Sequence, residues 1–289
     1  AVVCGFEWGA DSSGLWELQR RLDMVEPAVR GFAYEGATMA SVVVDAMSGW
    51  RRGRTRELLA GPGRPHLFLT YIGIGFAMAR LPRTLWGKVV PDLDGMPYHP
   101  TMSWLAVDGY GFDLAYFHTE RWVDRRQEPE PYPWEGSPAY FSRAVDQGIG
   151  RALWFIHGAD VTAVAGAVRS FPRRRQPDLW SGVGLAASFA GGAGRDALGA
   201  LVRLAGDHRS ELALGAVFAA KARTWAGHVP AHTGVACAAF GAMPVQNAVA
   251  LADDTAVGAS DGTADRPAYE IWRSRIRGHF APAARDRAG

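Results

Sequence analysis

The sequence has few cysteines and no long apolar run. Cys4 and Cys237 are the only two cysteines among 289 residues. Two thiols are too few for a disulfide framework or a cysteine zinc site, and they fit a reducing cytoplasm. The longest apolar stretch, Leu67 to Leu81, is shorter than the ~20 residues that cross a bilayer. We therefore expect a cytoplasmic protein without a membrane span.

The chain also lacks a surplus of either charge, since 31 basic residues balance 29 acidic ones. No basic block is interleaved with stacking aromatic residues, so the electrostatic footprint of a nucleic-acid-binding protein is missing. Hydrophobic residues make up 48% of the chain, an ordinary globular composition that can bury a full core without staples or metals. We therefore expect a globular protein with no nucleic-acid partner.

Common catalytic signatures are missing as well. The sequence has no glycine-rich phosphate loop, no His-Glu-x-x-His and no paired cysteines, and Trp180–Gly184 lacks the first glycine of a nucleophile elbow. Asp92 and Asp94 stand beside proline and glycine, which favours a solvated turn. His99 and His232 are the best pair for a metal, but no carboxylate follows at a recognisable spacing. We therefore expect no metal and no cofactor.

What the sequence does contain is a series of similar segments, in the same order, in its two halves. Gly9 matches Gly158 at an offset of 149, and the offset shrinks toward the end of each half. Such a duplication predicts two similar units related by a pseudo-twofold axis. The matched segments are Gly5–Asp11 with Trp154–Asp160, Gly31–Ala37 with Leu179–Leu185, Leu59–Ile72 with Leu204–Val217, and Trp86–Pro91 with Trp225–Pro230.

The composition of the connecting segments divides the chain. Residues 1–127 form the first expected unit, and residues 143–257 form the second. Residues 128–142, rich in Pro and Glu, are expected to be a linker. Residues 258–289 are expected to hold a Gly- and Asp-rich linker, one more helix and a tail.

The periodicity of apolar residues predicts a mainly α fold. Residues 15–25 and 161–171 repeat apolar side chains every three or four positions, which places one apolar stripe on a helix. Strict alternation is nearly absent apart from Trp104–Tyr110, where two neighbouring glycines make a turn equally plausible. His66–Arg83 and Glu211–Arg223 are rich in Gly and Ala, and we expect them to be the central pair of helices.

Four segments carry a resemblance to a known family: Arg30–Ala37, Asp108–Phe112, Asp178–Leu185 and Pro267–Arg273. Together they resemble the bacterial family called domain of unknown function 1702, over nearly the whole chain. Members occur among the genes of enediyne and related polyketide antibiotic pathways. The resemblance therefore implies an accessory biosynthetic role around a polyene or its early cyclised product, and it supplies no catalytic residues.

Glu35 and His157 are the leading candidates for chemistry. In the duplicated register, Glu35 matches Val183, and His157 matches Trp8. An ionisable group with an apolar counterpart is expected near the core, where burial perturbs its pKa unless a partner compensates. We predict acid and base roles for the two residues. The alternative is a structural role, in which Glu35 is hydrogen-bonded to Arg30 or a tyrosine and His157 is a satisfied core histidine.

Asp108 and Tyr110 rank next, because with Asp113 they stand in a Gly-rich aromatic segment found in the first half only. The 11 tryptophans predict either a bulky core or an aromatic-lined tunnel for a long conjugated hydrocarbon. The aromatic residues predicted to bind such a ligand are Tyr34, Tyr71, Phe76, Trp104, Trp154, Trp180 and Phe218.

Two functions follow from these observations. The first is a cofactor-independent isomerase or cyclase that uses acid and base chemistry on a long hydrophobic polyene or its early cyclised product. The alternative is a non-catalytic carrier or protective binder of the same molecule. We favour the enzyme. A homo-oligomer or a partner protein from the same pathway remains open.

Overall fold

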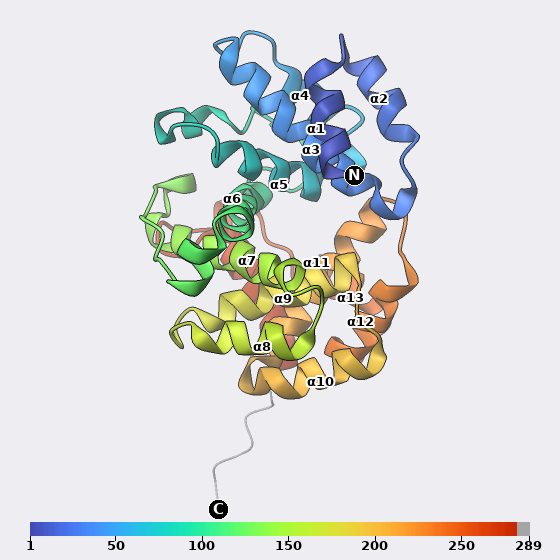
Figure 1. Ribbon diagram of the computed structural model, residues 1–289, viewed down its shortest axis with the longest axis vertical. Coiled ribbons are helices and arrows are strands. Elements are labelled where there is room, and N and C mark those ends of the chain that lie inside the picture. The colour runs from blue at the N-terminus through green and yellow to red at the C-terminus, as the bar shows by residue number, and fades with distance from the viewer. Residues whose placement is uncertain (282–289) are drawn as a thin grey trace, which may run out of the picture.

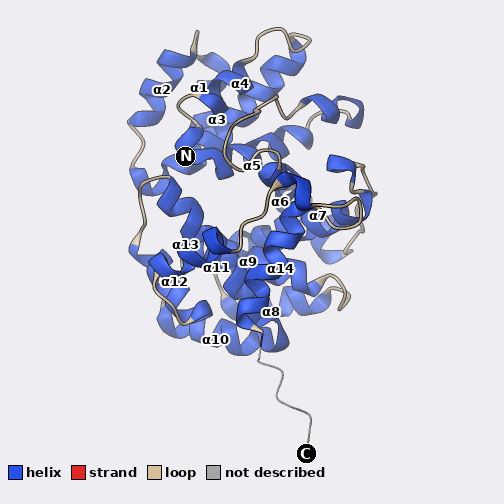
Figure 2. Cartoon of the chain, turned by 180° about the vertical axis from the view of Figure 1, so that it is seen from behind, coloured by secondary structure: helices blue, strands red, loops and turns tan. Residues whose placement is uncertain are grey.

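The computed structural model describes residues 1–281, and the regular structure in this part of the chain is entirely helical (Figure 2). The mainly α prediction is therefore confirmed. The α-helices are α1 (Val2–Asp11), α2 (Leu15–Asp23), α3 (Pro27–Met47), α4 (Arg54–Ala60), α5 (Leu67–Met78), α6 (Trp104–Phe117), α7 (Pro138–Ile156), α8 (Val161–Ser170), α9 (Gln176–Ala190), α10 (Arg195–Ala205), α11 (Arg209–Trp225), α12 (Ala231–Gly241), α13 (Val245–Asp254) and α14 (Ala268–Phe280).

Seven helices pack one after another in chain order: α1, α3, α5, α6, α7, α9 and α11. Figure 1 shows the series from the blue helices at the top to the green and yellow helices below. Each of α5, α6, α7 and α9 carries two glycines separated by one residue. Two residues along a helix turn by about 200°, so the two glycines face opposite sides. The first glycine touches the preceding helix of the series, and the second touches the following one.

The glycine contacts repeat one geometry. Where α6 crosses α7, a Cβ on Gly111 would lie 2.2 Å from the carbonyl oxygen of Val145, and a Cβ on Gly148 would lie 1.8 Å from that of Asp108. Each carbonyl belongs to the residue three positions before the partner glycine. The same reciprocal arrangement recurs where α1 meets α3, α5 meets α6, α7 meets α9 and α9 meets α11. The backbones therefore touch at distances that leave no room for a methyl group.

This use of glycine corrects two expectations. Residues 104–110 belong to α6 rather than to a strand or a turn, and Gly109 serves a helix contact. α5 and α11 are helices as predicted, but α6, α7 and α9 lie between them in the series, so they are not a directly packed central pair. The glycines in both helices bring neighbouring backbones together.

The series curves until α3, its second helix, meets α9 and α11. Arg223 on α11 donates hydrogen bonds to the carbonyl oxygens of Ala28 on α3 and Phe189 on α9. Phe32 on α3 meets Phe189 edge to face, with ring centroids 5.5 Å apart. We call these contacts of Arg223 and Phe32 the seam. They complete a ring in which α3, α5, α6, α7, α9 and α11 surround the centre of the molecule.

The C-terminal helix α14 is held by buried charges. Arg273 pairs with Asp178 on α9 at 3.4 Å and with Glu270 at 3.2 Å. Arg143 on α7 pairs with the same two carboxylates, and Tyr140 donates a hydrogen bond to Glu270 at 2.8 Å. Burial opposes ionisation of Glu270, but the surrounding arginines lower its pKa to about 2. The network places α14 beside the ring. The tail expected after it lies outside the described residues.

No single described helix is both long and apolar enough to cross a membrane. Only α12 and α13 taken together meet that criterion by length and composition, and they bend by 67° at their junction.

The repeated glycine contacts make a prediction about stability. Gly148→Ala should lower the free energy of unfolding by roughly 3 kcal/mol, because its new Cβ would overlap the Asp108 carbonyl. Gly166→Ala on α8 is the matched control, since its Cβ would meet nothing within 4 Å and should stabilise the helix by about 0.5–1 kcal/mol. Urea denaturation of both variants measures the difference. Equal stabilities would contradict a tight crossing.

Candidate functional site

A narrow cavity of about 50 Å³ lies inside the ring. It has room for a few water molecules, whereas a drug-sized ligand needs ~300 Å³ or more. Its walls come from all six ring helices and from α14. The apolar residues of the wall include Phe32, Phe68, Leu69, Ile72, Met102, Leu105, Phe155, Leu185, Phe189 and Phe218.

Five successive helices each contribute a cavity residue from the same position of the glycine pattern. The residue directly before the first glycine of the crossing points its carbonyl at the next helix and lines the cavity. On α3 this pattern is Glu35-Gly36, with Thr38 in place of the second glycine. Four of the five residues are polar, so the crossings gather polar side chains on one wall. The five are Glu35, Ile72, Asp108, Gln147 and Ser181.

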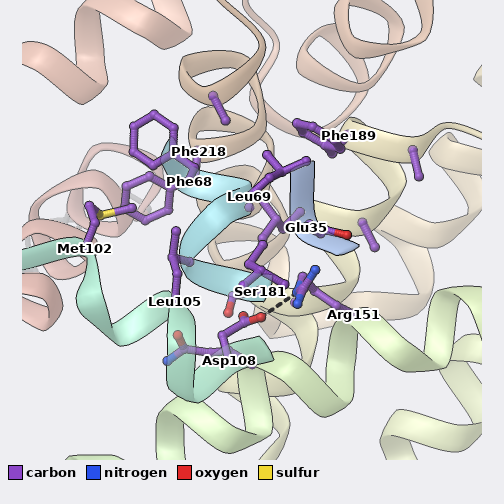
Figure 3. A pocket seen from close by; sticks show the side chains of 18 of the residues that line it. Glu35, Phe68, Leu69, Met102, Leu105, Asp108, Arg151, Ser181, Phe189 and Phe218 are labelled. Carbon is purple, nitrogen blue, oxygen red and sulfur yellow. Dashed lines mark hydrogen bonds and ion pairs between the residues drawn. The ribbon is translucent and has the colours of Figure 1, made fainter. Parts of the chain in front are cut away.

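Glu35 is buried without a hydrogen bond to any described residue, and only 3% of its surface is exposed. Burial raises its pKa to about 8. The charge of Arg151 lowers this pKa and the charge of Asp108 raises it, each by less than burial does. The predicted burial of Glu35 is thus confirmed. The alternative partner Arg30 instead donates hydrogen bonds to the carbonyl oxygens of Val25 and Asp23. Figure 3 shows the Glu35 carboxyl near the Arg151 side chain.

Asp108 and Arg151 form a buried ion pair at one end of the cavity. The Nε of Arg151 lies 2.5 Å from the Oδ1 of Asp108, and the pair is drawn with a dashed line in Figure 3. Burial raises the pKa of Asp108, while the guanidinium opposes that shift. The Nη2 of Arg151 and the Oε1 of Gln147 are buried and have no partner among the described residues. Besides the Glu35 carboxyl, the cavity wall therefore carries one unpaired donor and one unpaired acceptor.

Two other predicted site residues lie away from the cavity. His157 follows the end of α7 as its C-cap residue and does not line the wall. Tyr110 packs against Trp86 and Phe141, with ring centroids 4.8 and 6.3 Å away, and does not line the wall either. Asp113 pairs with a surface arginine at 2.6 Å. The structure therefore does not place His157 beside Glu35, where the two could act together as base and acid.

The aromatic residues predicted to bind ligand are mostly placed elsewhere. Phe218 lines the cavity, whereas the others fill the core around it because large rings pack best where no space is left. The aromatic wall consists mainly of phenylalanine, and the sequence reasoning missed it by favouring tryptophan. The six residues outside the wall are Tyr34, Tyr71, Phe76, Trp104, Trp154 and Trp180.

The two histidines considered for a metal are engaged separately. His99 Nδ1 lies 3.0 Å from the hydroxyl of Tyr71, and His232 Nε2 lies 2.9 Å from the carbonyl oxygen of Phe189. Ligand atoms of Asp92, Asp94 and His99 lie within 4.8 Å of one another. The two aspartates are exposed, and Asp94 donates its N–H to the Asp92 carboxylate, which is the geometry of the predicted turn.

Comparison with known proteins places the chain in a family. The family described as Protein of unknown function (DUF1702) matches residues 1–280. The chain belongs to this family. No curated protein and no solved structure matches the chain. All four segments that carried the resemblance to DUF1702 meet at the cavity, through Glu35, Asp108, Ser181 and Arg273 respectively.

The raised pKa of Glu35 in this DUF1702 protein makes a prediction about pH. The unfolded chain releases the Glu35 proton near its ordinary value of 4.5, whereas the folded chain keeps it up to about 8. Glu35 therefore lowers stability progressively as pH rises through that window. Glu35→Gln removes this effect, so its stability gain over the natural chain should grow by a few kcal/mol between about pH 5 and pH 8.

Urea denaturation at several pH values measures this gain. Glu7→Gln is the control, because Glu7 is exposed on α1. A gain for Glu35→Gln that does not change with pH would contradict the raised pKa.

Proposed function

We propose that this protein is an accessory enzyme of enediyne polyketide biosynthesis that binds a long hydrophobic polyene, or its early cyclised product, in the central cavity. Glu35 acts as the acid and base. The observation that carries the proposal is a narrow, mainly apolar cavity with a buried carboxyl group that has no hydrogen-bond partner among the described residues. The assignment to a pathway rests on the family resemblance alone.

The chemistry proposed for Glu35 is a proton shuttle. With a pKa of about 8, Glu35 is mostly protonated at neutral pH and is suited to donate a proton to one carbon of a conjugated chain. The resulting carboxylate then takes a proton from another carbon, so the net change is isomerisation, with ring closure in between for a cyclase. Neighbouring phenylalanine rings face the positive charge that forms on the chain.

Binding of a long molecule requires the cavity to widen. At the seam, α3 meets α9 and α11 without a glycine crossing, through the hydrogen bond of Arg223 to Ala28 and the contact between Phe32 and Phe189. Phe155 also lines the cavity and is 38% exposed, which places it between the interior and the solvent. We propose that ligand enters the cavity when the seam opens and the side chains of Phe32, Phe155 and Phe189 rotate.

A carrier or protective binder is the second candidate function. The position of His157 favours it, because the predicted partner for Glu35 is missing from the cavity wall. A binder would hold the same molecule without exchanging its hydrogens. The two functions therefore differ in one measurable event, the transfer of a proton to carbon.

We also infer that the two halves arose by duplication, with a register different from the one read from sequence. Gly36 on α3 touches α1 in the same way that Gly182 on α9 touches α7, and the two glycines are 146 residues apart. In this register Glu35 matches Ser181 rather than Val183, and both line the cavity. Gly9 lies inside α1, whereas the glycine first matched to it follows α7 with a φ of +56°. A pseudo-twofold relation between the halves remains part of this inference.

The proton transfer can be tested in deuterated water. The natural chain, incubated with the primary amide of a conjugated polyene fatty acid, should place deuterium on carbon, which mass spectrometry detects. Glu35→Gln keeps the shape but removes the acid, so incorporation should fall by a factor of about 100 or more. Glu7→Gln should behave like the natural chain.

Three outcomes separate the proposals. Incorporation that survives Glu35→Gln would overturn the role of Glu35. Binding of the polyene without any incorporation would favour the carrier. If no polyene binds, both functions are wrong.

A further inference from the structure

The unpaired groups of Gln147 and Arg151 point to the class of ligand. We infer that the cavity selects a hydrophobic molecule whose head is neutral and carries both a carbonyl group and an O–H or N–H, as a carboxamide or a protonated carboxylic acid does. This inference rests on the proposed function, because it names the ligand class of the same cavity. The head would accept from Arg151 and donate to Gln147.

The orientation of Gln147 follows from its partners. Its Nε2 donates to the Oδ1 of Asp178 at 2.9 Å and to the hydroxyl of Tyr140 at 3.1 Å. A carboxylate only accepts hydrogen bonds, so the amide nitrogen must face Asp178. The Oε1 consequently faces away from Asp178. It is buried, has no partner in the described part of the chain, and belongs to a cavity residue that is 1% exposed.

Arg151 supplies the matching donor. Its Nε is used by Asp108, while its Nη2 has no partner among residues 1–281. Arg151 follows Gln147 by four residues on α7, so the two side chains lie on the same face of the helix. Because both side chains line one cavity, a single head group can reach the donor and the acceptor together.

The charges around the cavity disfavour an anionic head group. Arg151 is paired with Asp108, and Arg273 is paired with Asp178 and Glu270. Each arginine of the wall thus already has a carboxylate partner, which a phosphate or an ionised carboxylate would have to displace. Arg223 has no carboxylate partner among the described residues, but it lies outside the wall and donates to the carbonyl oxygens of Ala28 and Phe189.

The rest of the ligand meets an apolar wall. Figure 3 shows Asp108, Arg151 and Ser181 on one side of the cavity, with Phe68 and Phe218 on the other. A molecule anchored by its head at Arg151 would therefore run its chain along the phenylalanines. A hydrocarbon without a head would leave both buried polar groups unpaired, which is unfavourable.

A series of ligands with the same conjugated chain tests the head group. The probes are the primary amide, the methyl ester and the hydrocarbon of one polyene, and Kd is measured at pH 7 by polyene fluorescence. The amide satisfies both groups, whereas the ester only accepts. We expect the amide to bind about 10-fold or more tighter than the ester, and the hydrocarbon to bind weakest. Equal affinities for amide and ester would overturn the inference.

A pair of variants tests the donor. Arg151→Lys keeps the charge beside Asp108 but loses the second nitrogen, so the ester should lose its advantage over the hydrocarbon. Arg80→Lys is the matched control, because Arg80 pairs with Asp113 on the same helix as Asp108 but does not line the cavity. It should leave the series unchanged. An ester advantage that survives Arg151→Lys would overturn the role of Arg151.

The ligand series also separates this inference from the proposed function. If all three ligands bind equally, the cavity binds polyenes and only the head-group inference fails. If none binds, the proposed function fails and the inference fails with it.

Discussion

Contact between helix backbones through glycine is the constraint on which the rest of the structure depends. Apart from the seam, neighbouring helices of the ring touch at sites where a Cβ would overlap a carbonyl oxygen. In five successive helices, that carbonyl belongs to the residue directly before the first crossing glycine of the helix. Contacts this short allow Cα–H···O interactions, which are weak individually. Their effect is geometric. Because Glu35, Asp108, Gln147 and Ser181 all stand beside crossing glycines, the packing that builds the ring also gathers its polar wall.

Burial of the charges beside the cavity is not by itself a source of stability. A buried ion pair such as that of Arg151 and Asp108 often contributes no more than well-packed apolar residues of the same size, but removing one partner is strongly destabilising. The same argument applies to Arg273 and Glu270, which fasten α14 beside the cavity. Pairing these charges leaves Glu35 as the neutral acid of an apolar space. The wall therefore combines paired charges with one neutral carboxyl group.

Helical periodicity and burial could be predicted from the sequence, while the meeting of distant residues could not. Glu35 was found because a lone carboxylate in an apolar segment must be buried, and it is. His157 was singled out because its counterpart in the matched segments is a tryptophan, but it lies at the C-cap of α7 and outside the cavity wall. Gln147 and Ser181 were missed, although both precede the first glycine of a Gly-x-Gly pair on a helix. That pattern is visible in the sequence, but it identifies residues of the cavity wall only once the crossings of the helices are known.

The same pattern separates a rigid part of the cavity from an adaptable one. Gln147 directly precedes a crossing glycine, so its backbone is held by a contact that tolerates almost no displacement. Phe32 lies at the seam, and Phe155 lies at the exposed end of the wall. We propose that the space of about 50 Å³ grows by rotation of phenylalanines and by opening at Arg223, while the polar groups stay in place. A fixed head-group site with a yielding apolar wall suits chains of different length that share one polar end.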